Sequence, residues 1–160
     1  MTTKRSLNRH TAREKVLQAL YAIEISKEKP ENVFNYIFEN EERESDDFRF
    51  AQKLFNLTIE NSDLYLKTIS EKLQNWDINR IAILDKIILK MSLCELNEFK
   101  DIPPKVTFNE AITLAKYFST DESSKFVNGV LNAIFKELEE NKSIKKTGRG
   151  LLSTSKKIKR

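Results

Sequence analysis

The chain has 160 residues, enough for one domain with a single hydrophobic core, and only three glycines and three prolines. Few turns are therefore expected, and the recurrence of Ala, Leu, Ile, Glu and Lys at helical spacing predicts an all-α fold. One cysteine and one histidine exclude an internal disulfide and leave too few ligands for a zinc or catalytic cluster. We therefore expect no metal site. The N-terminus has no apolar signal region, so we expect a cytoplasmic protein.

The net charge of +4 is unevenly distributed along the chain. Residues 1–15 hold five basic and one acidic side chain, and residues 141–160 hold eight basic and none, whereas the body between them is acidic. Basic ends on an acidic body are typical of a protein that contacts a polyanion, although basic tails also occur where they only aid solubility. Apolar periodicity stops at residue 140. We therefore predict a helical domain over 1–140 and a disordered basic tail over 141–160.

Seven helices are expected. The first begins at Asn8 or at Thr11, because Thr11 and Glu14 have the spacing of a capping box. Thr107 and Glu110 form a second capping box, which predicts the start of the sixth helix. In chain order, the expected helices cover about residues 8–26, 30–38, 47–60, 63–76, 78–96, 107–118 and 120–140.

The helix expected over 78–96 is apolar around most of its circumference. Such a helix needs neighbours on several sides and is predicted to lie in the middle of a bundle. It is too short and too charged to span a membrane. Asp85 is the exception on its apolar arc, and a carboxylate there needs a partner. Gly129, inside the last helix, costs about 1 kcal/mol relative to alanine, which suggests that another helix or a ligand approaches its backbone.

A row of side chains on the first helix has the composition of a nucleic-acid contact. Arg9, Arg13, Leu17 and Tyr21 are spaced by four residues and lie along one face. Two arginines and a tyrosine in line can bind phosphates and stack a base. The alternative is that Tyr21 is an aromatic residue at the edge of the core and that the arginines are solvated.

Motifs of catalysis are absent from the sequence. It contains no glycine-rich phosphate loop, no nucleophile elbow and no cluster of metal ligands. Paired acidic residues such as Glu139 and Glu140 fall at helix ends, where they do not form a convergent acid–base pair. The residues alone therefore favour a small helical adaptor that contacts nucleic acid and a protein.

Several sequence motifs resemble the NusB family of transcription antitermination factors over residues 4–140. They are Arg9-His-Thr-Ala-Arg-Glu14 with Gln18-Ala-Leu-Tyr21, Leu84-Asp-Lys-Ile-Ile-Leu-Lys90 with Glu95-Leu96, Asn109-Glu-Ala-Ile112 with Leu114-Ala-Lys116, and Lys125-Phe-Val-Asn-Gly-Val-Leu131. Their order and spacing in an all-α chain of this length make the resemblance specific.

The resemblance implies a compact seven-helix fold in two helical halves and a non-catalytic function without a cofactor. It implies binding of boxA, a short single-stranded element of ribosomal RNA transcripts, together with NusE, a small-subunit ribosomal protein. The pair then joins RNA polymerase and other Nus factors and suppresses premature termination. Family members are monomers or dimers, so a homodimer stays open.

The resemblance also implies roles for individual residues. The implied RNA contacts are Arg5, Arg9, His10, Arg13, Tyr21, Lys125, Phe126 and Asn128. The implied NusE contacts are Asn79, Asp85 and Glu122, although an internal salt bridge or a wet edge would also explain Asp85. His10 and Thr11 stand where many family members carry arginine, and the long basic tail exceeds the family pattern. We expect the tail to supply part of the missing positive charge.

Three other classes of function are alternatives to this one. NusB-like domains occur fused to RNA methyltransferases, but this chain has no room for a domain that binds a nucleotide cofactor. A helical bundle that binds only proteins would have no affinity for boxA. A helix-turn-helix DNA-binding protein would need a short turn before an exposed recognition helix, and the Pro103-Pro104 connection and the apolar last helix argue against it.

Overall fold

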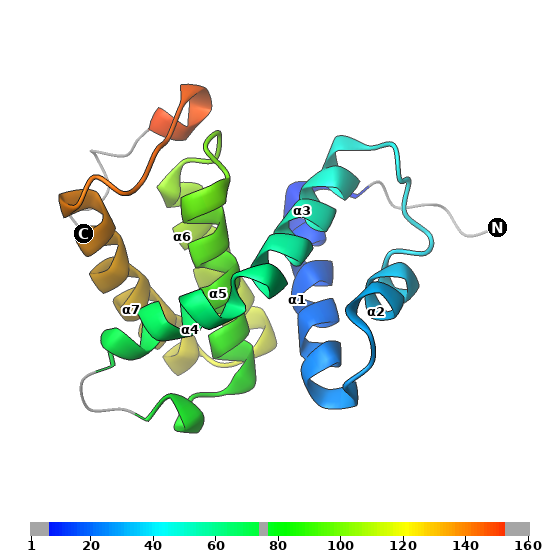
Figure 1. Cartoon of the computed structure of the whole chain (residues 1–160), viewed down its shortest axis with the longest axis horizontal. Coiled ribbons are helices and arrows are strands. Elements are labelled where there is room, and N and C mark those ends of the chain that lie inside the picture. Colours follow the sequence, from blue (N-terminus) through cyan, green and yellow to red (C-terminus); the bar gives the residue numbers. More distant parts are fainter. Residues whose placement is uncertain (1–6, 74–76, 153–160) are drawn as a thin grey trace. The chain divides into compact units, whose positions relative to one another are not determined.

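A computed structural model of the chain describes residues 7–73 and 77–152, and within these ranges it is all-helical (Figure 1). The described residues form seven α-helices and two 3₁₀ turns and contain no strand, which confirms the predicted fold class. The α-helices are α1 (Arg9–Ser26), α2 (Pro30–Ile37), α3 (Asp46–Glu60), α4 (Ser62–Glu71), α5 (Ile83–Glu98), α6 (Pro104–Phe118) and α7 (Asp121–Glu140). The fourth helix ends at Glu71, so its predicted end at Trp76, a residue outside the described part of the chain, is wrong. The chain divides into two compact units, Met1–Glu60 and Asn61–Arg160.

The first unit packs α1 against α2 and α3 around a cluster of phenylalanines. Phe34 stacks on Phe38 with ring centroids 4.3 Å apart, and Phe48 and Phe55 lie against Phe34 at 5.7 and 5.0 Å. Asn8 caps α1, because its side-chain oxygen accepts a hydrogen bond from the Thr11 amide at 2.7 Å. Of the two predicted starts, Asn8 is therefore correct.

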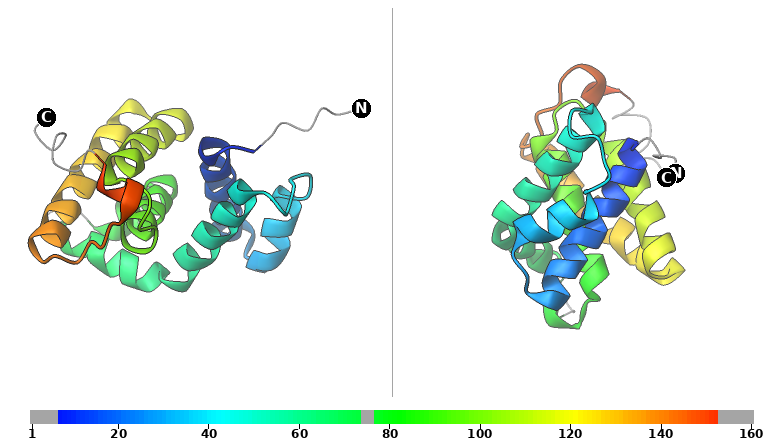
Figure 2. Two further views of the ribbon diagram at one scale, coloured as in Figure 1. Left: turned by 90° about the horizontal axis from the view of Figure 1, so that it is seen from above. Right: turned by 90° about the vertical axis from the view of Figure 1, so that its right-hand side faces the viewer.

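The second unit surrounds α5 with α4, α6 and α7 (Figures 1 and 2). Eleven of the sixteen residues of α5 are buried, which confirms that this helix is central. Its predicted start at Ile78 is wrong. Asp77 accepts a hydrogen bond from the Asn79 amide at 3.0 Å and closes a 3₁₀ turn (Ile78–Arg80), after which Ile81 is extended and α5 begins at Ile83.

The predicted capping box at the start of the sixth helix is also wrong. The helix begins at Pro104, whose fixed φ suits the first helical position. Thr107 lies within α6 and is buried, and its hydroxyl donates to the Glu95 carboxylate of α5 at 3.2 Å. Thr120 does cap α7, since its hydroxyl oxygen accepts from the Ser123 amide at 3.0 Å.

The predicted disordered tail needs correction over its first part. Residues Lys142–Leu152, which we call the strap, lie over the loop between α5 and α6 and end in a 3₁₀ turn (Gly148–Leu151; Figures 1 and 2). The Lys146 ammonium donates to the carbonyl oxygens of Glu95 and Phe99 at 3.1 and 2.7 Å. The Thr147 amide donates to the Lys100 carbonyl at 2.9 Å. Residues 153–160 lie outside the described part of the chain.

The strap is ordered because it binds the C-terminal end of α5. The last carbonyls of a helix have no partner within the helix, and a lysine that reaches them satisfies their hydrogen bonds and complements the helix dipole. Burial lowers the pKa of Lys146 to about 8, and the carboxylates of Glu95 and Asp101 oppose this shift. Gly150 fits closely, since a Cβ there would lie 1.9 Å from the Lys100 carbonyl oxygen.

Gly129 lies in open space, and the expectation that a neighbouring helix approaches it is wrong. A Cβ at this position would meet nothing within 4 Å. We predict that Gly129→Ala raises the free energy of unfolding by about 1 kcal/mol, because alanine loses less backbone entropy in a helix. Thermal denaturation should show a midpoint higher by about 2–4 °C. Gly150→Ala is the control and should lower the midpoint; an unchanged or lower midpoint for Gly129→Ala would contradict the prediction.

Candidate nucleic-acid interface

Two of the three arginines predicted to contact RNA, Arg9 and Arg13, stack on one aromatic ring of the first unit. The guanidinium carbons of Arg9 and Arg13 lie 4.3 and 5.0 Å from the ring centroid of Phe50 on α3. Arg9 also forms an ion pair with Asp47 at 3.2 Å, and its side chain is 45% exposed. Arg13, in contrast, is buried. The predicted row is therefore interrupted, and Arg9 is the arginine of the pair that solvent reaches.

The other N-terminal residues of the predicted contact differ in exposure and partners. His10 is partly exposed, with its Nε2 3.4 Å from the Glu14 carboxylate one turn further along α1. Tyr21 is 39% exposed at the surface of α1, so both a stacking role and a position at the edge of the core remain open. Arg5 lies outside the described residues. The exposed part of this face is therefore Arg9, His10 and Tyr21.

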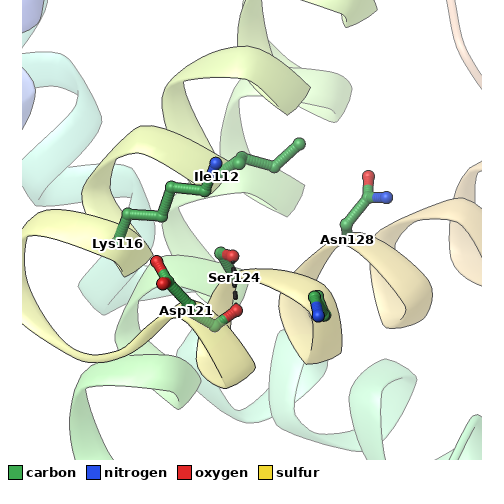
Figure 3. A pocket seen from close by; sticks show the side chains of 6 residues that line it. Ile112, Lys116, Asp121, Ser124 and Asn128 are labelled. Carbon is green, nitrogen blue, oxygen red and sulfur yellow. Dashed lines mark hydrogen bonds between the residues drawn. The ribbon is translucent and has the colours of Figure 1, made fainter.

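A second cluster lies in a pocket between α6 and α7 of the second unit (Figure 3). The pocket has a volume of about 390 Å³. Its lining residues are Ile112, Lys116, Asp121, Ser124, Lys125 and Asn128. It brings together Lys125 and Asn128, two of the three residues predicted on this helix. Phe126 does not line the pocket and is partly buried beside it.

Lys116 belongs to this pocket and was missed as a site residue by reasoning from sequence. Ile112 and Lys116 are one helical turn apart on α6, so that both side chains flank the pocket across from α7 (Figure 3). The spacing was visible, but the sequence does not show that this face of α6 opposes Lys125. Two ammonium groups then share the pocket with one carboxylate, that of Asp121.

The chemistry of this pocket suits a nucleic-acid strand. Lysine ammonium groups bind phosphate oxygens, and an amide such as Asn128 can both donate to and accept from the edge of a base. The Ser124 hydroxyl cannot readily donate a hydrogen bond to a ligand, because it already donates to the Asp121 carbonyl at 2.6 Å. Both lysines and Asn128 therefore remain the groups best placed to select a ligand.

Asp85 lies in the first turn of α5, against the start of α7, and neither a salt bridge nor a wet edge explains it within the described residues. It is only 6% exposed. Its Oδ2 accepts from the Ser123 hydroxyl at 3.0 Å, and the Ser119 and Ser123 hydroxyls are 2.8 Å apart. The buried Oδ1 has no hydrogen-bond partner in the described part of the chain. Burial raises the pKa of Asp85, and hydrogen bonds from Ser123 and Ser119 partly offset the rise.

The structure places the other two predicted partner contacts at the surface. Glu122 is exposed in the first turn of α7, next in sequence to Ser123. Asn79 is exposed in the 3₁₀ turn before α5. Over residues 7–73 and 77–152 there is no group of three His, Cys, Asp or Glu residues that would hold a metal ion. Nor does any helix in these ranges have the length and apolar character needed to cross a membrane.

Comparison with known proteins identifies the family. The model of the NusB family matches residues 10–136. The chain belongs to the NusB family. It is 40% identical over 149 residues to the transcription antitermination protein NusB of Chloroherpeton thalassium, a match that covers 91% of this chain and 70% of the relative.

Solved NusB structures show the same fold. T. maritima NusB superposes with a TM-score of 0.76 at 33% identity, covering 83% of this chain and 94% of that one. A chain from a crystal structure of the antitermination factors NusB and NusE in complex with double-stranded RNA superposes with a TM-score of 0.73 at 27% identity. That match covers 81% of this chain and 96% of the other. The predicted family and fold are thus confirmed.

We predict that Asp85→Asn raises the thermal stability at neutral pH. The raised pKa means that folding favours the protonated carboxyl, so its stabilising contribution is complete below the ordinary value of 3.8 and is lost as pH rises through the folded-state pKa. Asparagine mimics the protonated form at every pH. The gain in melting temperature should therefore be absent below pH 3.8 and grow toward neutral pH. A gain that does not vary with pH would contradict the assigned cause.

Proposed function

We propose that the chain is a cytoplasmic, non-catalytic adaptor that binds the boxA element of ribosomal RNA transcripts together with NusE. The complex then joins RNA polymerase and other Nus factors and suppresses premature termination. The observation that carries the proposal is the pocket between α6 and α7, where Lys116, Lys125 and Asn128 converge in a member of the NusB family. The similar chain crystallised with NusE and RNA adds support.

The RNA contact would have two parts, one in each unit. In the first unit the exposed residues Arg9, His10 and Tyr21 supply a cation, a ring nitrogen and an aromatic face. Arg13 acts as a positioning residue, because its buried guanidinium lies against the same Phe50 ring as Arg9. In the second unit Lys116 and Lys125 bind phosphates, and Asn128 with the partly buried Phe126 contacts bases.

The partner contact would involve Asp85, Glu122 and Asn79. The strongest argument for it is the buried Oδ1 of Asp85, which has no hydrogen-bond partner in residues 7–73 and 77–152, since such an oxygen gains most from a donor that a partner brings. Ser119 and Ser123 hold the other side of the carboxylate and fix its direction. Asn79, which precedes α5 in sequence, and Glu122, which follows it, add exposed polar groups.

The first experiment is a fluorescence-anisotropy titration of boxA RNA and a scrambled control, with and without NusE, at several salt concentrations. We expect tighter, sequence-selective binding in the presence of NusE. The pair of substitutions Lys116→Ser and Lys125→Ser should flatten the dependence of log K on log salt by about 1.4, or about 0.7 for each lost phosphate contact to a single strand.

The control pair, Lys29→Ser and Lys67→Ser, also removes two positive charges, but from exposed positions outside the pocket. It should leave the slope of log K against log salt unchanged. Equal binding to both RNAs without any effect of NusE would overturn the proposed function. It would leave a helical protein with basic ends and no selectivity for boxA, whereas no binding to either RNA would favour the alternative of a helical bundle that binds only proteins.

Asp85→Ala should weaken NusE binding by about 1–3 kcal/mol, the usual cost of leaving a buried hydrogen-bonding group without its partner. Isothermal titration calorimetry with purified NusE measures the effect, and circular dichroism checks that the variant is folded. A variant that melts at a lower temperature yet binds NusE as tightly as the original chain would show that Asp85 only organises the turn between α6 and α7.

A further inference from the structure

The strap has an inner face that holds it and an outer face that is basic. Inward, the Lys146 ammonium and the Thr147 amide bind carbonyls at the end of α5, and Gly150 lies closely against Lys100. Outward, the side chains of Lys142, Lys145 and Arg149 are exposed. No acidic residue occurs anywhere in 141–160. The strap is therefore a fixed row of cations, unlike a solvated basic tail.

Polar side chains continue from the pocket toward the strap on both α6 and α7. On α6, Lys105 and Asn109 precede the pocket residues Ile112 and Lys116 at steps of three or four residues. They therefore share one face of that helix, and its N-terminal end begins four residues after Lys100, which the strap binds.

The side chains of α7 that continue from the pocket are also polar. On α7, Asn132 and Lys136 follow the pocket residues Lys125 and Asn128 at helical spacing and are exposed. The Asn132 amide donates to Asn128 at 3.4 Å. The two helices are neighbours along this stretch, since Phe108 and Phe135 pack edge to face with centroids 5.5 Å apart.

We propose that the strap is a second RNA contact, in which Lys142, Lys145 and Arg149 bind the phosphates of a strand that continues from the pocket along these two helices. The inference rests on the proposed RNA binding. Lys105 and Lys116 are eleven residues apart, or about 16 Å along a helix. A strand bound at the pocket must therefore extend by several nucleotides to reach the strap. Phosphate is favoured over an acidic protein segment because these polar side chains lead to the candidate RNA pocket.

The test compares boxA RNA alone with boxA RNA extended by ten nucleotides at either end, titrated against the full chain at several salt concentrations. The extended RNA should bind more tightly and with a steeper dependence on salt. The substitutions Lys145→Ser and Arg149→Ser together should flatten the slope by about 1.4 with the extended RNA and leave the short RNA unchanged. The control pair Lys29→Ser and Lys67→Ser should change neither.

Gly150→Ala tests whether RNA binding requires the strap to be held in place or requires only its charges, because the substitution leaves every charge unchanged. Its Cβ would meet the Lys100 carbonyl and displace the strap. Hydrogen exchange at the Thr147 amide reports the displacement, since this amide binds Lys100. If the Thr147 amide exchanges faster in Gly150→Ala, this variant should bind the extended RNA several-fold more weakly than the original chain does. It should bind the short RNA as tightly as the original chain. Normal binding of the extended RNA by this variant would overturn the proposal.

Two further outcomes are decisive. Equal affinity of the original chain for short and extended RNA would refute the strap contact while leaving the proposed function intact. Binding of polyglutamate through Lys145 and Arg149, without any gain from longer RNA, would refute it in favour of an acidic protein partner. Loss of boxA selectivity alone would count against the proposed function, since the gain with length is measured independently of sequence.

Discussion

Burial of α5 is the constraint on which the second unit depends. A helix surrounded by neighbours cannot expose its polar side chains to water, so each of these groups must find a partner on a packed helix. Lys90 donates to Ser62 of α4, Glu95 accepts from Thr107 of α6, and Asp85 accepts from Ser123 of α7. Each neighbour is therefore tied to α5 by at least one polar contact. Apolar packing tolerates sliding, whereas a hydrogen bond of about 3 Å fixes the register of two helices.

The pocket and the strap both follow from this arrangement. Because α6 and α7 are each positioned by α5, their outer faces meet in a fixed geometry and bring Lys116 of one helix opposite Lys125 of the other. The end of α5 leaves carbonyl groups that Lys146 binds, and this contact places the strap. A buried scaffold thus positions two basic surfaces without contributing a side chain to either.

The sequence was sufficient for the helices, the central position of α5 and the family, because apolar periodicity and motif spacing are local properties. It was insufficient wherever the outcome depends on a residue distant in the chain. Arg13 has the spacing of a surface arginine, yet Phe50 of another helix covers it. Thr107 has the spacing of a cap, but the Glu95 carboxylate on α5 recruits its hydroxyl into the core. The strap lacks apolar periodicity because it is held by hydrogen bonds and not by an apolar face.

Asp85 shows how such a constraint can serve binding. A carboxylate that is buried with only one oxygen satisfied lowers stability, because desolvation disfavours its charge. Two serines from the turn between α6 and α7 hold this carboxylate, although a neutral side chain would pack there at less cost. The arrangement makes physical sense if a donor from outside the chain reaches Oδ1, since the free energy withheld in folding is then released on binding. The same carboxylate would also disfavour any partner that presents an acceptor, so that it would select partners as well as bind them.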